Sequence, residues 1–409
     1  MADTNSKFDE NELLSKIFED LDISITDYDR AVKSYTAVGE YLEDSLGNSV
    51  NIYSQGSFAY RTVTRPYRQG KDAEYDIDLV CEYKPAPDDP ETCKTLCGNA
   101  LEASERYKKM LKDEEGRKTW TLEYAEVDEV DFHIDILPSK HATAERIQRL
   151  MQQDVPMKYA QTAIMITTKK EDGRYIWDDS NPKGYKAWLD DITSLYKQEE
   201  RIIHKDSVER VPGQNESKTS VHRVIQILKR HRDVRFDKAN KSDIKPISMI
   251  ITTLAAKVAE ANENKSVSIF ELLELVIRSA AKVKELSEKN MRYDDFEESF
   301  IKRKDNGEWE IKNPVNPEEN FADKWHENNS EKAKAFFQWV DWVNQDLLNP
   351  LMERNSVKAF KVLSEGLGSD VIRGVYKKMA LPAVEPTINI VHKEDTKDMP
   401  KPWRSDESK

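Results

Sequence analysis

Two aspartates, Asp76 and Asp78, lie one residue apart in the apolar stretch YDIDLV at residues 75–80. The β-branched and aromatic residues around them predict a strand, in which side chains two positions apart point to the same face. Two carboxylates held side by side repel each other unless a cation or a proton relieves the charge. Their oxygens suit Mg²⁺ or Mn²⁺. A single D-x-D is also typical of a solvated strand face, so its surroundings decide between the two interpretations.

A third carboxylate, Asp135, lies between two isoleucines in a second strand-like stretch, VDFHIDILP at 130–138. Three carboxylates on adjacent strands can hold two divalent ions, one beside an attacking hydroxyl and one on the phosphates of a nucleotide. We expect His133 to pack or to hydrogen-bond beside Asp135 rather than to act as a general base.

A Gly-Ser pair precedes the carboxylates. Gly56 lets the backbone approach a phosphate closely, and Ser57 with its neighbouring amides can donate hydrogen bonds to phosphate oxygens. Gly-Ser alone is usually a plain turn. The ordered combination of Gly-Ser, a D-x-D strand and a third strand aspartate is much more specific for nucleotide chemistry.

The elements that must position these residues can be predicted from hydrophobic periodicity. An apolar stripe with a 3.6-residue period predicts a long helix over 25–46. Strands are expected at 50–53, 75–83, 120–127, 130–137, 163–168 and 174–177. The later sequence predicts helices at 184–200, 219–235, 246–262, 268–289, 330–348 and 356–379, with a surface loop at 303–320.

This pattern indicates an α+β fold, in which a twisted mixed sheet is followed by helices. We expect a catalytic domain at 1–175 that includes the long N-terminal helix, a helical domain at 176–391 and a charged, flexible tail at 392–409.

Composition excludes several classes of protein. The net charge of −13 argues against a broad basic surface that coats nucleic acid, and leaves only a local phosphate site. No stretch approaches the roughly 20 apolar residues that span a bilayer. The polar, acidic N-terminus lacks the pattern of a signal peptide, and the three cysteines lack a zinc-binding spacing, so we expect a cytoplasmic protein with reduced thiols.

The residues carry a family resemblance. The Gly-Ser pair and the three aspartates are similar to the active-site pattern of the DNA polymerase β-like nucleotidyltransferases. More specifically, the chain resembles the bacterial oligonucleotide cyclases of anti-phage signalling, the CD-NTases, which are related to cyclic GMP-AMP synthase and oligoadenylate synthase. The matching stretches are SQGSFAYRT, YDIDLV, FHIDILP, SNPKGYKAWL, VIQILKRHRD, KPISMIITTLAAK and NPVNPEENFADKW.

The resemblance implies a polymerase β-like core packed on an oligoadenylate synthase-like helical domain, with nucleotides bound in the cleft between them. It also implies site residues in this chain. The three metal-binding acids are Asp76, Asp78 and Asp135, the phosphate-binding pair is Gly56 and Ser57, and the residues that bind the donor triphosphate are Lys229 and Ser248.

The activity implied is condensation of ribonucleoside triphosphates, ATP among them, into a cyclic di- or trinucleotide with release of pyrophosphate. The resemblance also implies two Mg²⁺ ions as cofactors of this reaction, with Mn²⁺ as a substitute. The product would act on a separate effector protein, and a regulatory partner protein can belong to the system. Activation by DNA is not expected, because the chain lacks the Cys/His cluster of the animal DNA sensor.

An alternative with the same carboxylates is a template-independent enzyme that extends RNA ends into linear products. The bases, the ring size and the 2′–5′ or 3′–5′ linkage stay open from sequence.

One stretch departs from the family pattern. Eighteen residues separate Ser57 from Asp76, which predicts an inserted loop over the cleft. Its cations are Arg61, Arg65, Arg68 and Lys71. We take them as solvated, with contact to phosphates as the alternative.

Overall fold

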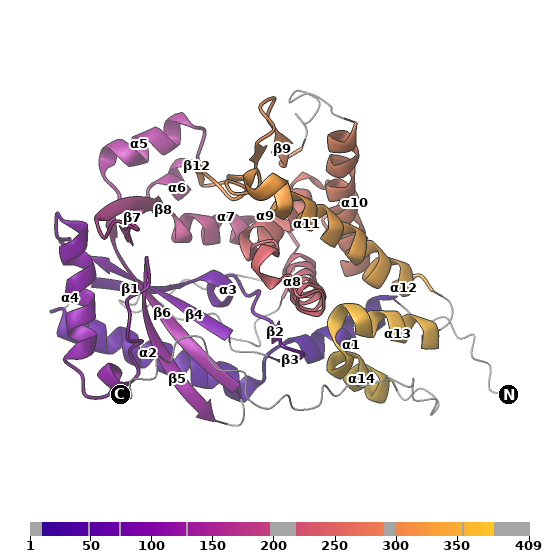
Figure 1. Ribbon diagram of the computed structural model, residues 1–409, viewed down its shortest axis with the longest axis horizontal. Helices are drawn as coiled ribbons and strands as arrows, with labels where there is room; N and C mark the ends of the chain where they lie inside the picture. The colour runs from indigo at the N-terminus through magenta and orange to yellow at the C-terminus, as the bar shows by residue number, and fades with distance from the viewer. Residues whose placement is uncertain are drawn as a thin grey trace, which may run out of the picture.

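The computed structural model describes residues 10–47, 50–72, 75–127, 130–196, 218–289, 299–353 and 356–379. A six-stranded sheet lies in the first half of the chain (Figure 1), and its strands run in the order β1-β4-β6-β7-β8 with β5 paired to β6. The β4–β6 pair is parallel and the other pairs are antiparallel, so the sheet is mixed, as predicted. The strand bounds are β1 Val50–Gln55, β4 Tyr75–Tyr83, β5 Trp120–Val127, β6 Val130–His141, β7 Ile164–Lys169 and β8 Tyr175–Ser180.

Helices α2 (Ile25–Ser45) and α4 (Pro90–Glu102) pack against the sheet. The hydroxyl of Ser24 caps α2 by accepting a hydrogen bond from the backbone N–H of Asp27, 3.0 Å away. Alternate residues of β4, among them Ile77, are fully buried in one core with apolar residues of both helices. Because side chains alternate along a strand, this burial leaves Asp76 and Asp78 on the opposite face.

The rest of the described chain is mostly helical. α8 is the central helix of this part and contacts α9, α10, α11 and α13, which surround it in Figure 1. The helix bounds are α7 Pro182–Ser194, α8 Ser220–Lys238, α9 Ser248–Ala261, α10 Ile269–Glu288, α11 Glu327–Val343, α12 Asn349–Leu351, α13 Ser356–Leu367 and α14 Ser369–Lys378. α8 is buried on nearly all sides, and its buried residues include charged ones that contact neighbouring segments.

The N-terminal helix α1 (Glu10–Leu21) belongs spatially to this helical part, because it packs on α8, α10 and α14. Lys378 donates a hydrogen bond to Asp20, with Nζ and Oδ1 2.9 Å apart. Gly374 lets the two helices approach, since an added Cβ would lie 2.4 Å from Oδ2 of Asp20.

Two expectations about the elements are wrong. The single helix predicted at 356–379 is two helices, separated at Gly368, whose φ of +96° lies outside the helical range. The loop predicted at 303–320 contains short paired strands, which its prolines and asparagines do not indicate. They are β9 Lys302–Arg303, β10 Trp309–Glu310, β11 Lys312–Asn313 and β12 Asn316–Asn320.

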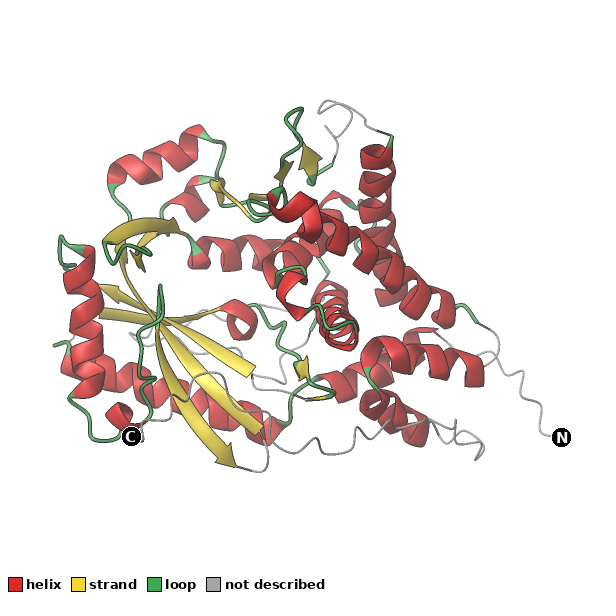
Figure 2. Cartoon of the chain, in the orientation of Figure 1, coloured by secondary structure: helices red, strands yellow, loops and turns green. Residues whose placement is uncertain are grey.

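The predicted strands and the remaining predicted helices agree with the structure to within a few residues where it describes them. Figure 2 distinguishes the helices and strands of the described chain by colour. The tail at 392–409 lies outside the described residues. The division of the chain at residue 175 stays a prediction. No helix of the described ranges is both long and apolar enough to span a bilayer.

Candidate active site

The parallel register of β4 and β6 brings two of the three aspartates together. Asp78 is the Cα partner of Asp135, and Asp76 is the partner of His133. On its other side β4 pairs with β1, where Gln55 lies opposite Asp78. The chain therefore leaves β1 directly beside the carboxylates and enters the Gly-Ser turn there.

Gly56 packs directly against Asp78. It opens the one-turn helix α3 (Gly56–Ala59) with a φ of +67°, which L side chains rarely adopt. A Cβ added to Gly56 would lie 2.1 Å from Oδ2 of Asp78. Both the backbone conformation and the contact thus require glycine at this position.

Two of the carboxylates are held by neighbouring side chains. Nε2 of His133 lies 2.6 Å from Oδ1 of Asp76, a side chain that is 57% exposed. Thr121 on β5 donates its hydroxyl to Oδ1 of Asp135 at 2.5 Å. His133 precedes Asp135 by two residues on β6, so both side chains lie on the same face, and the parallel register also places His133 beside Asp76.

The carboxyl group of Asp78 is buried between charged neighbours. Burial raises its pKa to about 7, and the neighbouring charges of Asp135 and Asp76 add to the effect, against smaller opposing contributions from His133 and Lys229. A carboxyl that resists ionisation beside two other acids is a site that a divalent cation would stabilise.

The donor set therefore fits a hard divalent ion, since it consists of carboxylate oxygens. In the described ranges, no three His, Cys, Asp or Glu side chains converge as a ready-made metal cage. Asp76 and Asp135 are turned toward His133 and Thr121 instead. Each of these contacts uses the Oδ1 oxygen, so the second oxygen of each carboxylate is the one that could bind an ion in the present arrangement.

Helix α8 and the start of α9 form the side of the site that lies opposite the carboxylates, the facing wall. Lys229 is only 8% exposed, and its Nζ donates to the carbonyl oxygen of Thr62 at 3.0 Å. Burial lowers its pKa to about 8, with a further contribution from Arg232. Arg232 in turn donates to Oγ of Ser248, the first residue of α9, at 3.0 Å, and pairs with Asp233 at 2.9 Å.

A cleft of about 1290 Å³ connects the two walls. Six of the seven residues predicted from sequence line it: Gly56, Ser57, Asp76, Asp78, Lys229 and Ser248. Asp135 is absent from the lining and lies beside Asp78 on the neighbouring strand. Arg232, for which the sequence favours a solvated helix face, is instead buried and lines the cleft three residues after Lys229.

The inserted loop does not stay in solvent as expected. Nε of Arg65 donates to the carbonyl oxygen of Asp22 at 3.1 Å. Arg68 and Lys71 are exposed, but both line the cleft. The interpretation of these cations as solvated is therefore wrong for Arg65, which contacts the backbone of the turn between α1 and α2.

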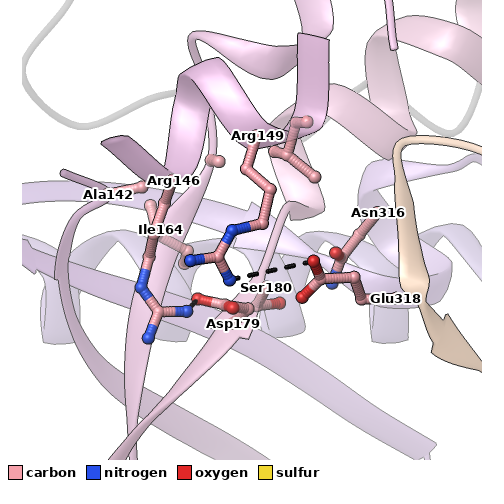
Figure 3. A pocket seen from close by; sticks show the side chains of 10 residues that line it. Ala142, Arg146, Arg149, Ile164, Asp179, Ser180, Asn316 and Glu318 are labelled. Atoms are coloured by element: carbon pink, nitrogen blue, oxygen red, sulfur yellow. Dashed lines mark ion pairs between the residues drawn. The ribbon is translucent and has the colours of Figure 1, made fainter. Parts of the chain in front are cut away.

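A second hollow, shown in Figure 3, is much smaller at about 20 Å³ and has room for about one water molecule. It lies between α5 (Ala144–Gln152), β8 and β12. Arg146 pairs with Asp179, and Arg149 lies 3.8 Å from Glu318. None of the predicted site residues lines this hollow, and its ion pairs connect α5 to the two strands.

Comparisons with known proteins agree with the geometry of the cleft. No family model matches the chain. It is 28% identical over 378 residues to the c-di-GMP synthase of Roseivirga ehrenbergii, covering 90% of this chain and 86% of that protein. It is 25% identical over 319 residues to the cyclic dinucleotide synthase CdnG of Bradyrhizobium diazoefficiens, covering 73% of this chain and 66% of that protein.

A solved structure shares the fold. The CD-NTase CdnG of Bradyrhizobium diazoefficiens, in complex with GTP, aligns with a TM-score of 0.61 and 21% identity over 90% of this chain and 99% of that one. Sequence similarity along most of the chain, the common fold and the carboxylate cleft agree: the chain is similar to the cGAS/DncV-like nucleotidyltransferases, the CD-NTases.

Proposed function

We propose that this protein condenses two ribonucleoside triphosphates into a cyclic dinucleotide and releases pyrophosphate. The observation that carries the proposal is the arrangement at the cleft floor, where Asp78 lies beside Asp135 and Gly56 packs on the Asp78 carboxylate. The buried ammonium of Lys229 on the facing wall provides the positive charge that a triphosphate needs. The names of both curated relatives support a cyclic dinucleotide over a linear RNA product.

Asp76, Asp78 and Asp135 would hold the divalent cations, which we propose to be two Mg²⁺ ions with Mn²⁺ as a substitute. Such ions would supply Lewis-acid activation of the ribose hydroxyl and neutralise phosphate charge. To bind a cation, Asp78 must lose its proton. In the metal-free protein, burial and the neighbouring carboxylates stabilise the protonated form.

The chain's other site residues would bind and orient the donor nucleotide. Gly56 and Ser57 would contact its phosphates at the floor, and Lys229 and Ser248 would bind them from the facing wall. The ribose hydroxyl oxygen of the acceptor bonds to the α-phosphorus while the bond to the β-phosphate breaks, and the hydroxyl proton is lost to water. Lys229 then compensates the charge of the departing pyrophosphate.

Guanine nucleotides are the first substrates to test, because a c-di-GMP synthase and a GTP-bound CdnG are among the relatives. ATP, the nucleotide expected from the sequence, is the second. We place the reaction in the cytoplasm, where its product would act on a separate effector protein in anti-phage defence, and a regulatory protein partner would control its rate.

The test is incubation of the purified protein with all four ribonucleoside triphosphates and Mg²⁺ or Mn²⁺, followed by phosphatase treatment and mass spectrometry. A phosphatase-resistant dinucleotide, absent with Asp76→Asn/Asp78→Asn and present with the surface control Asp172→Asn, supports the proposal. Long chains that carry phosphatase-sensitive ends would establish the RNA-end alternative instead.

A further inference from the structure

A short basic hairpin, residues 67–72, forms part of the lining of the cleft. It consists of β2 (Tyr67–Arg68), a turn at Gln69 and Gly70, and β3 (Lys71–Asp72). Arg68 and Lys71 are cross-strand partners, so their side chains lie on the same face of the hairpin. Like charges directly opposite each other destabilise a strand pair. Since both residues line the cleft, an anion in the cleft would relieve this repulsion.

The turn of the basic hairpin is held by the helical part of the protein. Gln69 and Gly70 have φ values of +53° and +82°, the left-handed pair of a type I′ turn, which is uncommon for a glutamine. Asp237 on α8 accepts a hydrogen bond from each backbone N–H, at 2.7 Å from Gln69 and 3.0 Å from Gly70. One carboxylate thus fixes both residues of the turn.

The base of the hairpin is fixed by a second residue of the same helix. Arg230 is fully buried, and its guanidinium lies 4.8 Å from the centre of the Tyr67 ring. It donates to the carbonyl oxygens of Arg65 and Leu367, each at 2.9 Å. A hairpin held at both ends can bind a ligand without first losing much conformational entropy.

The hairpin also lies close in sequence to the carboxylates of the cleft floor. Lys71 precedes Asp76 by five residues, which span at most about 18 Å of extended backbone. In the proposed reaction the acceptor nucleotide has its ribose hydroxyl at the carboxylates. Its own triphosphate must then lie away from Ser57 and Lys229, which would bind the triphosphate of the donor.

From these contacts we propose that Arg68 and Lys71 form a second polyphosphate subsite, which binds the 5′-triphosphate of the acceptor nucleotide, with Asp237 as the positioning residue. This inference rests on the proposed function. It adds a separate binding element for the second substrate, built from the inserted loop rather than from the Gly-Ser turn.

The test separates the roles of the two nucleotides. Dideoxy-GTP can only donate, because it lacks both ribose hydroxyls, whereas α,β-methylene-GTP can only accept, because its α–β bridge resists cleavage. Guanosine is an acceptor without phosphates. With dideoxy-GTP fixed, Arg68→Ala/Lys71→Ala should raise KM for α,β-methylene-GTP roughly ten- to a hundredfold and leave the use of guanosine unchanged.

Lys170→Ala/Arg174→Ala is the matched control, because it removes two cations from the β7–β8 hairpin, outside the cleft lining. Asp237→Ala provides a test of sign. If Asp237 acted only through its negative charge, its removal would tighten the binding of an anion and lower KM for α,β-methylene-GTP. If Asp237 positions the hairpin, as proposed, its removal should raise this KM, as the double variant does.

Equal effects on both acceptors, or no effect on either, would overturn the subsite. If the wild-type protein joins no nucleotides at all, the proposed function fails. The subsite is then decided by equilibrium binding of α,β-methylene-GTP, where an affinity unchanged in Arg68→Ala/Lys71→Ala would contradict it.

Discussion

The Cα hydrogens of Gly56 face the carboxylate of Asp78, at a separation that leaves no room for a methyl group. The position of the Gly-Ser turn and that of Asp78 are therefore interdependent. A change in either one must displace the other.

Gly56→Ala should abolish most activity while the protein stays folded. The left-handed φ costs about 1 kcal/mol, and the added methyl group would also push Asp78 aside. We expect a rate loss of about a hundredfold or more, measured as cyclic product per minute. Gly173→Ala is the control, since Gly173 also has a positive φ (+84°) but has nothing within 4 Å of an added Cβ. Equal losses in the two variants would show that the contact with Asp78 is unimportant.

Replacement of any of the three acids by asparagine should cost on the order of 4 kcal/mol in activation free energy, about a thousandfold in rate. The reason is that an amide keeps the shape of the side chain but loses the charge that a divalent ion requires. Steady-state rates of Asp76→Asn, Asp78→Asn and Asp135→Asn test this. Substantial activity in Asp78→Asn would contradict the assignment most directly.

The same Asp78→Asn substitution should stabilise the metal-free fold at alkaline pH. Because the folded-state pKa of Asp78 is raised to about 7, its protonated form favours folding, and that stabilisation is lost as pH rises from about 4 through 7. Asparagine resembles the protonated form. In thermal unfolding with EDTA, we expect the variant to melt at least about 2 °C higher than wild type at pH 8. The difference should shrink toward pH 5.

The pH dependence of catalysis should be bell-shaped. At limiting Mg²⁺, protonation of Asp78 below about pH 7 competes with the metal. Above about pH 8, Lys229 loses the charge that binds triphosphate. A profile of kcat/KM from pH 6 to 10 should therefore peak between 7 and 8. Lys229→Arg should remove the alkaline decline, because a guanidinium stays charged. An unchanged alkaline limb in this variant would exclude Lys229 as its cause.

Asp22, in the turn between α1 and α2, should be a main stabilising residue. Burial opposes its ionisation, but Lys218 and Arg223 outweigh that effect and hold its pKa below the usual range. Asp22→Asn leaves two largely buried cations poorly paired, so we expect about 3 kcal/mol of lost stability in urea unfolding at pH 7.

The lowered pKa of Asp22 also predicts how this effect depends on pH. The stabilisation by Asp22 is present above its unfolded-state pKa of about 4 and is lost as pH falls through the lower folded-state value. The effect of Asp22→Asn should therefore decrease below about pH 4. Asp172→Asn, which breaks an exposed pair with Arg174, should leave stability nearly unchanged at either pH.

Much of the fold and most of the site follow from local sequence. The alternation in YDIDLV already places Asp76 and Asp78 on one face, and the structure confirms that face. The contact of His133 with Asp76 depends on the register between β4 and β6, which are far apart in sequence, so the local pattern does not reveal it.

The contacts of the inserted loop were also beyond prediction. Arg65 binds a backbone carbonyl and Asp237 binds two backbone amides. Backbone groups are the same for every residue type, so the sequence holds no signal that would identify these partners. The helix over residues 10–21 was not predicted either, although Leu13, Leu14, Ile17, Phe18 and Leu21 recur with the spacing of a buried helix face.

The packing of α1 has a consequence for biosynthesis. α1 leaves the ribosome before any other described element, whereas α14, on which it packs, is among the last. At 5–20 residues per second, about 20 seconds or more pass before the two helices can meet. Until then the apolar face of α1 is covered only in part, by α8 and α10 as these emerge, so chaperone binding to the nascent N-terminal segment should limit the yield of active enzyme.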